Sequence, residues 1–263
     1  MTDDALLRRD WPPPAPGAAP LPRMVRTQAG LELRTLVRNG EQLLLTLIIP
    51  VLLLVAFGHA DLVSVGPDRI GFIVPGILAL AVLSTAFTSQ AIATGFERRY
   101  GVLKRLGATP LSRRGLIAAK TVTVLVVEVA QAAIVLAVGT ALGWRPVADP
   151  AAVVWVPLLL IAGTAAFSGL ALLLAGTLRA EATLAAANLL YLIMLGLGAV
   201  LFPLTKFPAG VRPVLRLLPA DALADGLRSV LAHAGGVPTT DLLVLCVWAA
   251  AAIALAARTF RWE

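Results

Sequence analysis

Long stretches without a single Asp, Glu, Lys or Arg divide this sequence, and they constrain its fold more than any other feature. Five such runs occupy residues 42–60, 70–96, 150–178, 182–205 and 242–257, and a sixth at 121–144 is interrupted only by Glu128. A helix needs about 20 apolar residues to cross the hydrocarbon core of a bilayer. With 59% hydrophobic and 14% charged residues, the composition also lies outside the range of soluble domains. We therefore expect an all-α integral membrane protein with six transmembrane helices.

The positions of the cations predict how these helices are oriented. If the N-terminus is inside, the inner segments hold 16 of the 22 Lys and Arg residues and the outer segments hold six. The positive-inside rule then places both termini in the cytoplasm. The formal net charge of +7 reflects this orientation, and no nucleic-acid partner is expected. The predicted spans lie at about 42–60, 70–95, 116–142, 153–178, 182–204 and 240–257.

Three segments outside the spans have patterns of their own. Residues 1–22 hold six of the 18 prolines, which favours a disordered cytoplasmic tail. Residues 23–40 have helical periodicity with a basic polar face, which predicts an amphipathic helix in the inner interface ahead of a six-span domain at 41–263. Between 205 and 241, two short apolar helices that are too short to span predict a re-entrant pair in the outer leaflet, before the last span.

The loop after the second span carries the densest pattern. Four large side chains lie at helical spacing and predict a short helix with one apolar side: Phe96, Tyr100, Leu103 and Leu106. Gly107 offers a C-terminal cap for this helix. Thr109 is then predicted as an N-cap, with Pro110 in the first position of the helix that becomes the third span. Two helices that meet at a rigid corner can transmit force, whereas a plain positive-inside loop requires only the charges.

This loop resembles a known family. The pattern Glu97-x-x-x-Gly101-x-Leu103-x-x-Leu106-x-x-Thr109-Pro110, with a basic pair after it, is similar to the cytoplasmic loop of ABC-2 type permeases, the membrane subunits of one class of ATP-binding-cassette exporters. The resemblance covers nearly the whole chain after residue 23, and the layout is close to bacterial drug exporters of the daunorubicin type. It implies a cytoplasmic coupling helix that docks on a separate ATPase subunit. The implied coupling residues are Glu97, Arg98, Arg99, Tyr100, Gly101, Leu103, Lys104, Leu106, Thr109 and Pro110.

The resemblance also implies an assembly. The chain would be a permease subunit in the bacterial cytoplasmic membrane, with no catalytic site or cofactor of its own. Two copies of a P-loop ATPase would bring ATP and Mg, and a second six-span subunit, in a homodimer rather than a heterodimer, would complete the export path. The implied cargo is hydrophobic or amphipathic, either a drug or antibiotic or a lipid-like molecule. A P-loop needs a lysine after a glycine, and none of the three lysines, Lys104, Lys120 and Lys206, follows one.

Several polar side chains within the predicted spans are candidates for the substrate path. Glu128 is a carboxylate inside a span, where an ionisable group should face the bundle interior or water. Gln131 follows on the same helical face. The same residues are also compatible with a structural role, as hydrogen-bonding groups between helices. The remaining path candidates are Ser84, Thr88, Asn188 and Tyr191.

Two other functions are compatible with the sequence. A secondary transporter could move protons through Glu128, although a single acid is a sparse relay and paired broken helices are missing. An intramembrane enzyme could use Ser168, although no histidine lies within a span to act as its base. Cys246 is the single cysteine, so an internal disulfide and a cysteine-based zinc site are excluded.

Overall fold

The computed structural model describes residues 17–40, 44–59, 68–147, 149–232 and 237–259, and the regular structure of these residues is entirely helical. The expected all-α class is therefore confirmed for this part of the chain. The α-helices are α1 (Leu21–Arg38), α3 (Ile49–His59), α4 (Arg69–Val82), α5 (Gln90–Arg99), α6 (Val102–Gly107), α7 (Arg113–Ala141), α8 (Ala152–Thr177), α9 (Ala180–Leu197), α10 (Arg212–Leu215), α11 (Pro219–Leu231) and α12 (Thr239–Thr259). The other helical turns are η2 (Leu44–Ile48), η3 (Leu83–Ser89) and η4 (Leu204–Lys206).

Within the described part of the chain, five helical stretches are long and apolar enough to cross a membrane. They are Arg69–Arg99, Gly115–Ala141, Ala152–Thr177, Ala180–Leu197 and Thr239–Thr259. The predicted first span contains a shorter apolar helix at Thr46–His59, and residues 41–43 and 60–67 beside it lie outside the described part of the chain. The chain thus has the helices of a multi-pass membrane protein, while the sixth span stays a prediction.

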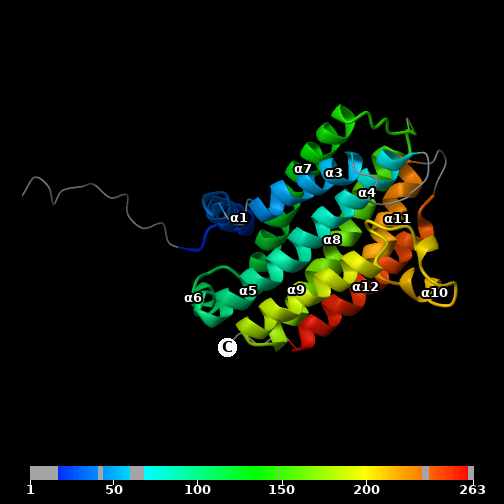
Figure 1. Ribbon diagram of the computed structural model, residues 1–263. Coiled ribbons are helices and arrows are strands. Elements are labelled where there is room, and N and C mark those ends of the chain that lie inside the picture. The colour runs from blue at the N-terminus through cyan, green and yellow to red at the C-terminus, as the bar shows by residue number, and fades with distance from the viewer. Residues whose placement is uncertain (1–16, 41–43, 60–67, 148, 233–236, 260–263) are drawn as a thin grey trace, which may run out of the picture.

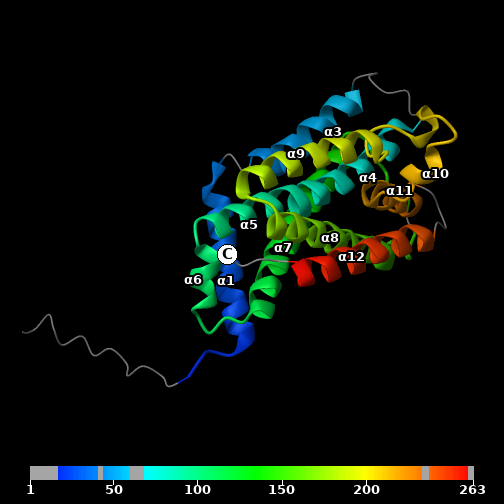
Figure 2. The same cartoon turned by 90° about the horizontal axis from the view of Figure 1, so that it is seen from below.

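The second predicted span forms the centre of the fold. α4, η3 and α5 make one continuous rod from Arg69 to Arg99, and most of its apolar length is buried by other helices (Figures 1 and 2). α3, α7, α8, α9 and α11 all pack against this rod. In η3 the helix widens to hydrogen bonds between residues five apart, a geometry that often occurs at functional positions. The rod therefore connects the two ends of the bundle mechanically.

We name these two ends after the short helices that lie there. α6 and the last turn of α12 lie at the α6 end, and α10 and α11 lie at the α11 end (Figure 1). α1 packs against α7 and also lies near the α6 end (Figure 2). α8 and α9 form an antiparallel hairpin whose short turn, at Leu178 and Arg179, is at the α6 end as well. The first and last described helices thus reach the same end of the bundle.

Several helix boundaries differ from those expected. α1 begins at Leu21, so Leu21 and Pro22 are helical and not part of a tail. Proline suits the first helical turn because the N–H groups of that turn have no acceptor within the helix, and proline has no N–H. Residues 1–16 of the predicted tail lie outside the described part. α9 ends at Leu197, before the predicted end at 204, because the chain turns at Gly198 and at Ala199, whose φ is 47°.

α11 is a buried helix that packs against α4, α8 and α12. Its Arg228 donates hydrogen bonds from Nη2 to the Val200 carbonyl at 2.7 Å and from Nε to the Phe72 carbonyl at 3.2 Å. The guanidinium also lies over the Phe72 ring, 3.8 Å from its centroid. Gly76 makes this approach possible, because a Cβ there would lie 2.2 Å from the Val200 carbonyl oxygen. Arg228 therefore ties α11 to the central rod and to the segment after α9.

Substitution of Arg228 tests this attachment. Arg228→Ala removes two hydrogen bonds from a charged donor to buried carbonyls, so the free energy of unfolding should fall by about 3 kcal/mol. The measurement is the thermal melting of the purified protein in detergent. Arg216→Ala, at an exposed arginine of the preceding segment, is the matched control and should melt like the wild type. Equal melting of both variants would mean that apolar packing alone holds α11.

Candidate functional site

The segment from Glu97 to Pro110 lies at the α6 end, but residues 96–106 do not form the single short helix expected. α5 ends at Arg99, and Gly101 adopts a left-handed conformation with a φ of 67° before α6 begins at Val102. A residue in the left-handed conformation ends a helix and lets the chain change direction. Glycine adopts this conformation without steric cost. Tyr100 and Leu103 consequently do not share a face, since Tyr100 is 64% exposed and Leu103 is 1% exposed.

The corner that follows α6 also differs from the prediction. Gly107 is the last residue of α6, and the helix that continues into the third span begins at Arg113. Its N-cap is Ser112, whose Oγ accepts a hydrogen bond from the Gly115 N–H at 3.2 Å. The prediction of Thr109 as the N-cap was therefore wrong. Thr109 instead stabilises the preceding turn, because its Oγ1 donates to the Leu106 carbonyl at 2.6 Å.

A buried lysine holds this end of the bundle together. Lys120 lies on α7, and its side chain is only 9% exposed. Its ammonium lies 2.7 Å from Oε2 of Glu97 and donates a 2.9 Å hydrogen bond to Oε1 of the same carboxylate. It also lies 3.6 Å from Oε1 of Glu32 on α1, to which Gln28 donates a hydrogen bond at 3.0 Å. Buried ions are stable only when they are paired, so these charges fix α1, α5 and α7 to one another.

The two arginines after Glu97 attach the same segment to the α8–α9 hairpin. Arg98 donates a hydrogen bond to the Leu178 carbonyl, and Arg99 forms an ion pair with Glu181. Glu97, Arg98 and Arg99 are therefore engaged within the chain. The predicted coupling residues that remain well exposed without such an ion pair form what we call the docking surface: Tyr100, Lys104, Thr109 and Pro110.

Lys120 and Glu32 were not among the candidates from the sequence. One signal was present, because Lys120 is a cation inside the predicted span at 116–142, where an ionisable group requires a partner. The partner residues could not be identified in this way. Glu97 and Glu32 are distant in the sequence, and only the packing of α1 and α5 on α7 brings them together.

The polar side chains inside the bundle connect helices in pairs. Gln131 of α7 accepts a hydrogen bond from Thr85 Oγ1 at 2.9 Å and donates one to the Thr46 carbonyl at 2.6 Å. Glu128 accepts a hydrogen bond from Thr164 Oγ1 at 2.6 Å, and its other carboxylate oxygen has no hydrogen-bond partner among the described residues. These contacts join α7 to η2, η3 and α8 in the membrane interior.

The six predicted path residues do not gather around one cavity. Glu128 and Gln131 are buried, Ser84 and Thr88 are half-buried on the central rod, and Tyr191 is half-buried on α9. Asn188 is exposed on the outer face of α9. These positions are compatible both with helix contacts and with a path completed by a second subunit.

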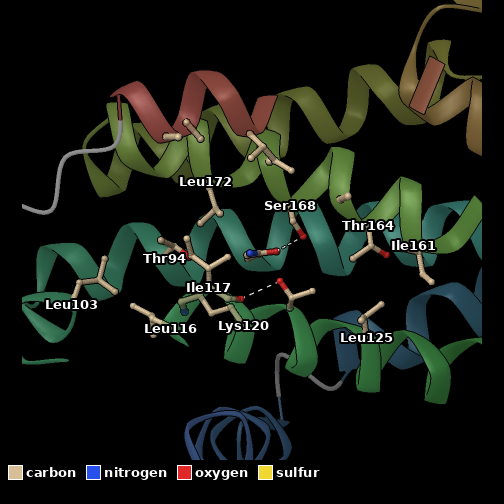
Figure 3. Close-up of a pocket in the computed structure, with 17 residues that line it drawn as sticks. Thr94, Leu103, Leu116, Ile117, Lys120, Leu125, Ile161, Thr164, Ser168 and Leu172 are labelled. Atoms are coloured by element: carbon tan, nitrogen blue, oxygen red, sulfur yellow. Dashed lines mark hydrogen bonds between the residues drawn. The ribbon is translucent and has the colours of Figure 1, made fainter. Parts of the chain in front are cut away.

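Two cavities lie on either side of Lys120. The first, which we call the α7–α8 groove, has a volume of about 380 Å³ and is lined by α5, α6, α7, α8 and α12 (Figure 3). The second has a volume of about 330 Å³ and lies between α1, α6, α7 and the central rod. Gln90, Thr94 and Lys120 line both cavities. Ser168 donates a 2.7 Å hydrogen bond to Gln90 in the wall of the groove.

Comparison with known families gives a clear result. The profile of the ABC-2 type transporter family matches residues 28–232, which include Glu32, Glu97 and Lys120. The chain belongs to the ABC-2 type transporter family. It is therefore the permease component of an ABC transporter and a transport protein rather than a catalytic enzyme, and this family normally works with an ATP-binding subunit. A search of curated proteins found no match.

The buried ion pairs of this permease predict a specific stability pattern. Lys120→Met leaves two partly buried carboxylates without a cation, so the free energy of unfolding should fall by about 3 kcal/mol. Neutralising the partners in the triple variant Lys120→Met/Glu97→Gln/Glu32→Gln should recover most of this loss, because no unpaired charge then remains. Lys104→Met, at an exposed lysine nearby, is the control. Thermal melting in detergent measures all three, and a Lys120→Met protein that melts like Lys104→Met would contradict the assignment.

Proposed function

We propose that this chain pairs with a second six-span subunit to form the path of an ATP-driven exporter. Two copies of a separate P-loop ATPase, which carry ATP and Mg, dock at the α6 end. The α6 end then faces the cytoplasm of a bacterial cell and both termini are cytoplasmic, as the distribution of Lys and Arg predicts. The observation that carries this proposal is the docking surface, which is exposed within a family-matched chain, while Glu97, Arg98 and Arg99 beside it are engaged in contacts within the chain.

The internal contacts of the α6 end suggest how movement of an ATPase reaches the membrane helices. A push on α6 acts on α5 through Gly101, and α5 is part of the rigid rod that extends to the α11 end. Lys120 links the same point to α1 and α7, while Arg98 and Arg99 link it to the α8–α9 hairpin. One displacement would therefore move several helices together, and Arg228 would resist it at the far end until α11 yields.

The cargo that we propose is hydrophobic or amphipathic, in the class of drugs, antibiotics or lipid-like molecules. A path between two copies would use the apolar faces of the spans together with a few polar groups. Glu128 is the best candidate among these groups, because one of its oxygens is buried and has no hydrogen-bond partner among the residues that the structure describes. α10 and α11 would form the outer re-entrant pair that closes this path.

The docking surface can be tested without disturbing the core. Tyr100→Asp places a carboxylate on an exposed position, so the membrane domain should melt normally while cargo-stimulated ATPase activity falls at least about ten-fold, as for loss of a hot-spot aromatic at an interface. Leu103 is unsuitable for this test, because its side chain is buried. Val214→Asp, an exposed position on α10 at the opposite end, is the control for ATPase binding, and this variant should keep the partner bound.

The readout requires the ATPase partner itself. Gentle purification from the native membrane, followed by mass spectrometry, should recover a stoichiometric protein that carries a P-loop. The Tyr100→Asp variant should lose this protein, whereas Val214→Asp should keep it. Full retention of the partner and of stimulated activity by Tyr100→Asp would place the docking surface elsewhere.

A second candidate function is proton-coupled transport through Glu128. The specific observation is the unpartnered carboxylate oxygen in the bundle interior, which could accept a proton. Transport into proteoliposomes distinguishes the two candidates: the ABC mechanism requires the ATPase partner and ATP, whereas the secondary transporter requires only an imposed proton gradient.

Substitution of Glu128 separates a role in the path from a structural one. Glu128→Gln should reduce the transport of a cationic cargo at least about ten-fold more than that of a neutral one, because the amide no longer balances the positive charge in a medium of low dielectric constant. Thr164→Val, which removes the hydrogen bond but keeps the carboxylate, is the matched control. Equal loss for both cargoes would assign Glu128 to helix packing.

A further inference from the structure

None of the six predicted path residues lines the α7–α8 groove, although Glu128 accepts a hydrogen bond from the lining residue Thr164. α12 packs closely along α8, whereas α7 contacts α8 at few points, so the groove lies between α7 on one side and α8 and α12 on the other. Leu103 and Leu116 lie at one end of the groove, and Leu125 and Ile161 lie at the other (Figure 3). The groove is therefore elongated along the helices.

The dimensions of the groove match one leaflet of a bilayer. From Leu116 to Leu125 on α7 the helix rises about 14 Å, and from Ile161 to Leu172 on α8 it rises about 16 Å. Half of a hydrocarbon core is about 15 Å. The groove thus has the length of one acyl chain in a single leaflet, beginning at the α6 end and ending near the bilayer centre.

The groove is open to the side, towards lipid. Ile117, Ile161 and Ile253 line it from three different membrane-spanning helices, and each is about half exposed. The lining is predominantly apolar, and its polar side chains are Gln90, Thr94, Lys120, Thr121, Thr164 and Ser168. In a membrane, the molecules that meet this opening are lipids, and an apolar chain is the part that such a lining accommodates.

Cations flank the groove at the α6 end. Lys104 directly follows Leu103 and Arg258 directly follows Ala257, and both cations are exposed next to these lining residues. Glu97 and Glu181 near this end are already paired, with Lys120 and Arg99 respectively. Each basic side chain near a membrane surface attracts anionic headgroups.

We propose that the α7–α8 groove binds one acyl chain of an anionic phospholipid from the leaflet at the α6 end, with its headgroup beside Lys104 and Arg258. The bound chain packs on Leu103 of α6 and along the wall that contains Lys120. It thereby supports the attachment of α6 to α7 from the lipid side. The test of this site needs no ATPase, because all of its residues belong to this chain; Lys104 also belongs to the proposed docking surface.

Photo-cross-linking tests the site directly. The purified chain is placed in phosphatidylcholine nanodiscs with a small fraction of phosphatidylglycerol that carries a diazirine near the end of one acyl chain, and labelled residues are mapped by mass spectrometry. Labels should concentrate at Leu125 and Ile161. Ala165→Phe fills the groove and should reduce this labelling about ten-fold, corresponding to the loss of about two buried methylenes.

Controls distinguish specific binding from contact with bulk lipid. Ala130→Phe adds the same ring at an exposed position of α7 outside the groove and should leave the labelling unchanged. Ala165→Leu is a milder filling variant in case Ala165→Phe melts early, and it should reduce labelling in part. The double variant Lys104→Gln/Arg258→Gln should abolish the preference for the phosphatidylglycerol probe over a phosphatidylcholine probe.

Three outcomes would overturn the proposal. The first is labelling that follows exposure evenly around α7, α8 and α12. The second is a pattern that stays intact in both Ala165→Phe and Ala165→Leu. The third is complete displacement of the probe by an exported cargo, which would assign the groove to cargo. The experiment uses neither ATP nor an ATPase, so its failure would leave the proposed export function untouched.

Discussion

A lysine ammonium buried between two carboxylates determines how the α6 end is assembled. Without Lys120, the carboxylates of Glu97 and Glu32 would repel each other in a region with little water, and α1 would lose its charged contact with the bundle. With Lys120 in place, α1, the α5 end of the central rod and α7 form one unit. The segment that we propose as the contact for an ATPase is mounted on this unit, and it is therefore held by ion pairs rather than by loop packing alone.

The central rod extends from this unit to the α11 end of the bundle. An α-helix transmits displacement along its axis because its backbone hydrogen bonds are satisfied within the segment, which a membrane interior also demands. The widened turn η3 places Thr85 against Gln131, and the neighbouring turn of α5 places Gln90 against Ser168. These hydrogen bonds connect the rod to α7 and α8 at mid-height. Gln131, which was a candidate for the substrate path, therefore serves as a connection between helices.

The long helices could be predicted from the sequence because the requirement that creates them is local: an apolar run must satisfy the hydrogen bonds of its own backbone in lipid.

Local patterns could not determine the details of the site. Thr109 and Ser112 are both good N-cap residues three positions apart, and only the fold selects Ser112. Gly101 was compatible with a continuous helix, and its left-handed conformation follows from packing Leu103 inward. The pairing of Lys120 with Glu32 joins residues that no periodicity relates. Asn188 fits a path by residue type, yet its exposure on α9 is a property of the assembled bundle.

The contacts of Arg228 at the α11 end have a consequence for the leakage of ions through the permease. If α11 must leave the rod for the path to open, both carbonyl hydrogen bonds have to break, at a cost of about 3 kcal/mol. A bias of that size keeps the open form below about one molecule in a hundred at rest. A permease with such a latch would preserve the ionic gradients of its membrane between transport cycles. A larger residue at Gly76 would disturb the latch, because its Cβ would lie 2.2 Å from the Val200 carbonyl oxygen that Arg228 binds.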